Sequence, residues 1–147
     1  LLSTSIQGEA SLVGRDLGAI LKQIDQSGKP VQRPACIIAG GETTVTLHGE
    51  GLGGRNLEVA LGAAQAIDGL ERVAFISLAT DGEDGPTDAA GAVVTGETLQ
   101  HARKAGLNPE DYLENNNTYP FFRELRGLIQ MGPTGTNVND LYFLLAY

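Results

Sequence analysis

Two short, continuous apolar runs, each leading into a glycine-rich polar loop, constrain the fold of this chain most strongly. The runs cover residues 35–39 and 73–78, and they lead into G-G-E at 40–42 and T-D-G at 80–82. Runs of this length are typical of buried strands in an α/β sheet. Ligands in such sheets bind beyond the carboxyl ends of the strands. If the two strands are parallel, the sequence therefore predicts that both loops lie at one edge of the sheet.

Helical patterns separate and follow these strands. Apolar residues between Ile6 and Ile24 recur at spacings of three and four, and S-G-K-P at 27–30 ends that helix. Further helices are expected at 55–67, 96–105, from Asn108-Pro109 onward and at 119–128, and further strands at 43–47 and 141–147. Interleaved strands and helices predict an α/β fold with three α/β/α layers. We expect the sheet to be mixed and mostly parallel.

Charge and cysteine content exclude several classes of partner. The net charge is −8, whereas nucleic acids and anionic membrane surfaces bind basic faces. No stretch approaches the roughly 20 apolar residues of a membrane helix, and no signal-peptide pattern is visible. The single cysteine, Cys36, lies in an apolar run, so we expect a core position and a cytoplasmic protein. Because the chain begins with Leu1 rather than Met, we expect a fragment of a longer protein.

The loop at 80–88, T-D-G-E-D-G-P-T-D, is the strongest candidate for chemistry. It holds four carboxylates in eight residues, at Asp81, Glu83, Asp84 and Asp88. Such density is self-repelling unless a cation or hydrogen-bond donors neutralise it, and magnesium with phosphate would do so. One carboxylate could instead act as a base toward a hydroxyl group. The alternative is a solvated turn in which Asp88 caps a helix.

The glycine loop at 49–54 offers backbone N–H groups to a helix start. It formally matches G-x-G-x-x-G, but the preceding residues 43–47 alternate polar and apolar, unlike the first strand of a dinucleotide-binding unit. A P-loop would need Lys where Arg55 stands. The glycines and Arg55 together favour an anion. The alternative is a hairpin loop with Arg55 in a surface ion pair.

A third polar loop, G-P-T-G-T-N-V-N-D at 132–140, precedes the last strand. Asn137 and Asn139 alternate, so one is expected to orient a substrate and the other to cap a turn. A plain turn is equally compatible with the pattern. His48 and His101 have no partner at metal-binding spacing, so we expect both at the surface.

Four motifs in this order resemble one known family. They are G-G-E-T-T-V-T at 40–46, G-L-G-G-R-N at 51–56, T-D-G-E-D-G-P-T-D-A-A-G at 80–91, and the loop at 132–140. Together they resemble the MOFRL domain, the carboxy-terminal domain of type 2 glycerate kinases, some of which carry the name hydroxypyruvate reductase. The resemblance makes residues 1–147 a single domain, with a leading helix in 1–30 and a motif-bearing core in 35–147. The run N-N-N-T at 115–118 departs from the acidic residue and serine expected there.

The resemblance implies an ATP-dependent kinase that phosphorylates the 2-hydroxyl of D-glycerate, with Mg²⁺. The family's larger amino-terminal domain carries a catalytic lysine that nothing here matches, so this chain is similar to one wall of an interdomain cleft. By the same resemblance, the catalytic candidates are Asp81, Arg55 and Asn137. Candidates for binding substrate or phosphate are Glu42, Gly53, Gly54, Asp84, Thr136 and Asn139, and candidates for holding the metal are Asp81 and Asp84.

Two other functions remain open at this point. One is an NAD(P)-dependent hydroxypyruvate reductase, and the other is a non-catalytic binding domain. The residues alone do not distinguish the 2-hydroxyl from the 3-hydroxyl, nor do they say which loop contacts ATP and which contacts glycerate.

Overall fold

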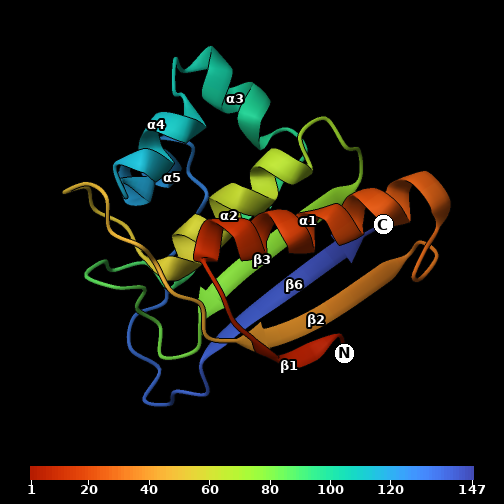
Figure 1. Ribbon diagram of the computed structural model, residues 1–147, viewed down its shortest axis with the longest axis horizontal. Helices are drawn as coiled ribbons and strands as arrows, with labels where there is room; N and C mark the ends of the chain where they lie inside the picture. The colour runs from red at the N-terminus through yellow and green to blue at the C-terminus, as the bar shows by residue number, and fades with distance from the viewer.

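The computed structural model describes residues 1–147 as one open six-stranded sheet with five helices (Figure 1). The strands are β1 (Ser3–Ile6), β2 (Ala35–Gly41), β3 (Val73–Ala79), β4 (Gly91–Thr95), β5 (Leu128–Ile129) and β6 (Asp140–Ala146). The helices are α1 (Ala10–Ser27), α2 (Arg55–Ala66), α3 (Thr98–Lys104), α4 (Pro109–Glu114) and α5 (Thr118–Glu124). The predicted α/β class and mixed sheet are confirmed. None of the helices is both long and apolar enough to cross a membrane.

The sheet is mixed, but the expectation of mostly parallel strands is wrong. Its order is β1-β2-β6-β3-β4-β5, and only β1 and β2 pair in parallel. The terminal strand β6 lies between β2 and β3 and runs antiparallel to both. Consequently β2 and β3 still point the same way, and their loops leave at one edge. The register makes this explicit, because Gly41 and Ala79 both pair with Asp140.

The expectation of three layers is also wrong, because the helices form one core with a single face of the sheet. Helices α1 and α2 lie across that face (Figure 1), and buried residues of α3 and α5 join the same apolar cluster. Strands β3 and β6 alternate strictly between buried and half-exposed residues. The half-exposed side chains lie on the opposite face. Cys36 of β2 pairs with Leu145 of β6 and is exposed on the same face, so the expectation that it fills the core is wrong.

Helices α1 and α2 pack closely because glycines line their contact. A Cβ atom at Gly14 would come within 2.0 Å of the Val59 carbonyl oxygen, and one at Gly62 within 2.1 Å of the Ser11 carbonyl oxygen. Such distances leave no room for any side chain. This close packing fixes α2 over the sheet, and α2 in turn carries Arg55 at its first position.

The amino-terminal helix begins later than predicted, at Ala10 rather than near Ile6. Ile6 continues the helical spacing by coincidence and belongs to β1. Gly8 separates the two elements, because its φ of +128° is incompatible with a continuing helix. The predicted strand at 43–47 is not formed either. Only Thr44 makes an isolated bridge, and the Glu9 carboxylate binds the backbone N–H and hydroxyl of Thr46.

The carboxy-terminal half follows its predicted pattern with shorter elements. Asn108 caps α4 as expected, its side chain accepting a hydrogen bond from the Glu110 N–H. Helix α5 ends at Glu124 rather than near residue 128, because Arg126 takes a left-handed conformation with φ of 57°. The short strand β5 follows, and the sequence pattern did not predict it.

Candidate functional site

The loop at 80–88, which follows β3, is joined by hydrogen bonds to the loop at 132–140, which precedes β6. Both lie where β2 and β3 end. The Thr80 hydroxyl donates to the Asn139 carbonyl at 2.7 Å and accepts from the Val138 N–H at 2.8 Å. The Thr134 hydroxyl donates to the Thr80 carbonyl at 2.6 Å. A Cβ atom at Gly82, whose φ is +95°, would lie 2.0 Å from the Gly132 carbonyl oxygen. The loops at 80–88 and 132–140 therefore form one rim.

Asp81 and Asn137, both catalytic candidates by the family resemblance, meet on this rim. The Asn137 side-chain amide donates from Nδ2 to Oδ2 of Asp81 at 2.9 Å. The Asn137 side-chain oxygen accepts the Asn139 N–H at 2.9 Å, so Asn137 itself closes the turn. The turn-capping role that was expected of one of the two asparagines therefore belongs to Asn137. The Asp81 carboxylate is partly exposed and available to a ligand.

Asp84 has a different environment from Asp81, although they share a loop. It is 1% exposed, and its carboxylate accepts the backbone N–H groups of Asn56 at 3.0 Å and Leu57 at 2.9 Å. These are free donors in the first turn of α2, so Asp84 caps that helix from a distant part of the chain. Burial raises the pKa of Asp84 to about 6, although these hydrogen bonds oppose the shift. The helix start thus already holds an anion of the protein itself.

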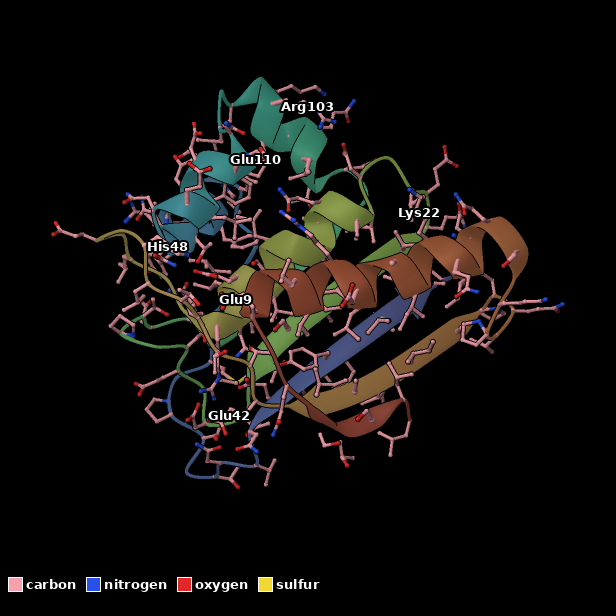
Figure 2. All side chains as sticks on the ribbon, viewed as in Figure 1. Glu9, Lys22, Glu42, His48, Arg103 and Glu110 are labelled. Carbon is pink, nitrogen blue, oxygen red and sulfur yellow. The ribbon has the colours of Figure 1, made fainter.

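Arg55 is held by two carboxylates. It donates from Nε to Asp140 at 2.7 Å and from Nη2 to the same carboxylate at 3.1 Å, while Nη1 contacts Glu42 at 3.2 Å. Asp140 is fully buried, and its hydrogen bond is the main reason that the pKa of Arg55 is raised. The Arg55 side chain is 31% exposed, so part of the guanidinium still faces solvent. Figure 2 shows Glu42 at this loop edge of the sheet.

A buried polar connection joins these groups. Asn56 is fully buried and donates from Nδ2 to Asp140 at 2.9 Å. Its side-chain oxygen accepts the Ser77 hydroxyl at 2.7 Å, which links α2 to β3. Asn56 Nδ2 also donates to Asp84 at 3.4 Å. One side-chain amide therefore binds the two buried carboxylates, Asp84 and Asp140, which would otherwise repel each other. Sequence reasoning missed Asn56, Ser77 and Asp140, since each partner lies far away in the chain.

The glycine loop is held in place by asparagines that sequence reasoning set aside. The side-chain oxygen of Asn116 accepts the backbone N–H groups of His48 at 2.7 Å and Gly49 at 3.0 Å. The side-chain oxygen of Asn117 accepts the Leu52 N–H at 3.0 Å. A run of three asparagines outside any predicted element was the signal that could have identified this role.

Beside Arg55, a cleft of about 560 Å³ lies between the glycine loop and the acidic loop. Its lining includes Thr43, Glu58 and Pro86. The Thr43 hydroxyl is buried and lies beside the hydroxyl of Tyr142, which is buried as well. Burial raises the pKa of Glu58, while a hydrogen bond from Asn116 acts in the opposite direction. A cleft with an arginine and a few other polar groups in its wall is a candidate ligand-binding site.

The remaining predicted residues divide between structural and exposed positions. Gly53 and Gly54 line the cleft, but a Cβ atom at either would lie 2.4 Å from a side-chain atom of Thr118 or Asp84. Both glycines therefore serve close packing. Thr136 and Asn139 are exposed on the rim. No group of three or more His, Cys, Asp or Glu side chains is placed to hold a metal ion.

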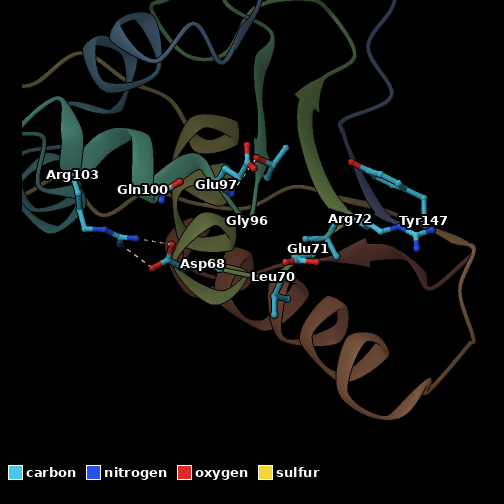
Figure 3. A pocket seen from close by; sticks show the side chains of 12 residues that line it. Asp68, Leu70, Glu71, Arg72, Gly96, Glu97, Gln100, Arg103 and Tyr147 are labelled. Atoms are coloured by element: carbon cyan, nitrogen blue, oxygen red, sulfur yellow. Dashed lines mark hydrogen bonds and ion pairs between the residues drawn. The ribbon is translucent and has the colours of Figure 1, made fainter.

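A second hollow, of about 590 Å³, lies at the opposite edge of the sheet (Figure 3). Its lining includes the Asp68–Arg103 ion pair on the helical side and the terminal residue Tyr147. None of the residues predicted from the sequence lines it. Both histidines are exposed, as expected, and neither belongs to this hollow.

Comparison with known proteins identifies relatives of this chain. A D-glycerate 2-kinase of Thermotoga maritima is 46% identical over 141 residues, covering 96% of this chain but 34% of the kinase. An Agrobacterium vitis protein with a provisional hydroxypyruvate reductase name is 41% identical, covering 99% of this chain and 34% of that protein. The chain thus spans about a third of the length of the curated relatives it matches.

A solved structure matches the fold closely. The crystal structure of the Thermotoga maritima glycerate kinase superposes with a TM-score of 0.97 at 46% identity, covering 99% of this chain and 35% of that chain. The model of the MOFRL family matches residues 35–140, which include all three polar loops. The chain therefore belongs to the MOFRL family.

Proposed function

We propose that this chain is the carboxy-terminal domain of an ATP-dependent glycerate 2-kinase and forms one wall of its active site. The supporting observation is the convergence of the Asp81–Asn137 pair, Arg55 and the adjacent cleft at one sheet edge. Its similarity to kinases about three times its length supports a site completed by an additional amino-terminal domain. The domain alone is then expected to be catalytically inactive.

Asp81 is the group best suited to assist phosphoryl transfer. It is a partly exposed carboxylate, and its hydrogen bond from Asn137 fixes its orientation. In this role Asp81 accepts the proton of the attacking glycerate hydroxyl or holds a cation beside the phosphates. Mg²⁺ is commonly bound by only one or two protein carboxylates, with substrate phosphates completing its coordination shell. The single accessible carboxylate of Asp81 fits this kind of site. Asp81 would hold the ion, which neutralises phosphoryl charge when bound with ATP.

Arg55 is proposed to bind the carboxylate of glycerate or a phosphate of ATP. Three of its N–H groups are engaged by Asp140 and Glu42, and a guanidinium has five. Because Asp140 holds one edge of the guanidinium rigidly, the exposed part is presented in a fixed orientation. Glu42 is 56% exposed and occupies the solvent side, so an anionic ligand has to share or replace that contact.

The reductase alternative has less support from the local structure. A dinucleotide-binding loop follows a strand and opens a helix. Here α2 follows the glycine loop, but residues 43–47 do not form the required strand. The carboxylate Asp84 also fills the helix start where a pyrophosphate would sit. We therefore place the kinase first.

The decisive experiment assays the full-length parent protein with two substrate pairs. With D-glycerate and ATP we expect 2-phosphoglycerate, and with hydroxypyruvate and NADH we expect no oxidation of NADH. Hydride transfer without phosphorylation would refute the kinase proposal. Arg55→Lys should raise the KM for an anionic substrate, since a point charge replaces the planar fork. The matched control is Arg123→Lys at an exposed position of α5.

A further inference from the structure

The sheet face opposite the helices presents an apolar surface that no described element covers. We call it the open face and define it by the outward side chains of β2, β6, β3 and β4. Its middle row, set by strand register, is Ile38, Phe143, Ile76 and Val93. No charged side chain of these strands points outward on this face. Ile38 and Val93, at the ends of the row, are 36% and 38% exposed.

The sequences of its central strands are those of strands buried on both sides. β3 reads V-A-F-I-S-L-A and β6 reads D-L-Y-F-L-L-A, with no polar alternation on the outward positions. A sheet that faces water on one side normally alternates apolar and polar residues. Apolar patches of several hundred Å² on a protein surface mark interaction sites. The open face therefore has the composition of a buried interface.

The size of the open face helps to distinguish two possible occupants, a second copy of this chain and another part of the same polypeptide. Four strands about 4.8 Å apart, with about 3.3 Å per residue along each strand, give an outline of roughly 400 Å². A stable dimer buries about 800 Å² of accessible surface on each partner, which is more than a face of this outline offers. Interfaces between domains of one chain are stable at smaller areas, because the covalent link keeps the local concentration high. The area favours an occupant on the same polypeptide.

We infer that the open face is covered by the part of the full-length polypeptide that lies outside residues 1–147, which supplies the third layer. The relatives offer such a part, since about two-thirds of their length lies beyond the matched region. The inference rests on the proposed function in one respect, namely that this chain is one domain of a longer kinase. The contact is separate from the catalytic rim, because the rim lies at the edge of the sheet and not on its face.

Thiol labelling of the full-length enzyme tests this inference. Cys36 lies on the open face and is the single cysteine of residues 1–147, so any other cysteine is first replaced. Ile38→Cys in a Cys36→Ser background then probes the middle row. Lys22→Cys and Lys104→Cys, at exposed helix positions, are matched controls in the same background. Each variant is mixed with a maleimide under native conditions, and the rate is followed by mass spectrometry.

We expect Cys36 and Ile38→Cys to react roughly 100-fold more slowly than the two controls, because a covered thiol reacts only when the contact opens. Rates within about threefold of the controls would overturn the inference, because local opening would then not be required. Protection that disappears on dilution would assign the face to a second copy and also overturn it. The readout needs no turnover, and the kinase assay on the same samples tests the proposed function separately.

Discussion

Asp81 and Asp84 belong to one loop and have opposite environments. Asp84 is 1% exposed, binds the first turn of α2 and has a pKa raised to about 6 by burial. Asp81 is partly exposed, and its carboxylate accepts hydrogen bonds from the Asn137 side-chain amide at 2.9 Å and the Glu83 backbone N–H at 3.3 Å. The difference teaches that one carboxylate anchors the loop to α2 while the other stays accessible to solvent. Substitutions at the two positions should therefore affect different properties.

The largest expected effect is on catalysis at Asp81. In the full-length enzyme, Asp81→Asn should lower kcat by about 100-fold to 10,000-fold, because the amide is neither a base nor an anionic ligand. The free energy of unfolding should change little, since the side chain is partly exposed. Steady-state kinetics and urea denaturation measure the two quantities. Glu83→Gln, its exposed neighbour, is the control, and equal losses in both variants would contradict the distinction.

Asp84→Ala should act on stability instead. Removing the carboxylate leaves the buried N–H groups of Asn56 and Leu57 without their acceptor. We expect a loss of about 2–4 kcal/mol in the free energy of unfolding, from the lost cap and the unpaired donors. Urea denaturation measures it, with Glu83→Ala as the exposed control. A loss below about 0.5 kcal/mol, typical of surface positions, would show that Asp84 does not anchor α2.

The raised pKa of Asp84 predicts a pH dependence of stability. The folded-state pKa of about 6 exceeds the ordinary value of 3.8, so the folded protein binds the proton more tightly. The contribution of this group to the free energy of unfolding is therefore largest at low pH. It falls by about 2 kcal/mol as the pH rises through 4 to 6. Between about pH 4 and 6, the free energy of unfolding of the wild type should therefore fall by this amount relative to that of Asp84→Asn, as measured by urea denaturation at each pH. A difference between the two proteins that stays constant with pH would refute the prediction.

The smallest effect is expected at Asn137. Asn137→Ala removes the amide that orients Asp81, and we expect about a tenfold fall in kcat with little change in the KM for ATP. Asn137→Asp, which keeps the turn acceptor for Asn139 but loses the amide donor, should fall at least as far. Kinetics of the full-length enzyme measure both. An unchanged kcat in Asn137→Ala would remove Asn137 from the site.

The sequence predicted the strands that build the site better than the contacts within it. The runs beginning at Ala35 and Val73 form β2 and β3 as expected, because continuous apolar residues have few alternatives to burial in a sheet. The family resemblance, rather than the loop pattern, named Asp81 and Asn137 together as site candidates, and the structure places them in contact. By contrast, the apolar pattern could not reveal that β6 lies between β2 and β3. The spacing of apolar residues identifies a strand but does not identify the strands with which it pairs.

The sequence by itself determined the apolar runs, the three polar loops and the motifs that place this chain in the MOFRL family. These properties are local, so neighbouring residues suffice to define them. Only the tertiary structure decided which carboxylate anchors α2 and which remains accessible. The donors that neutralise Asp84 belong to Asn56 and Leu57, 28 and 27 residues earlier in the chain. Burial and partner choice arise from packing across that separation, which brings α2 onto the acidic loop.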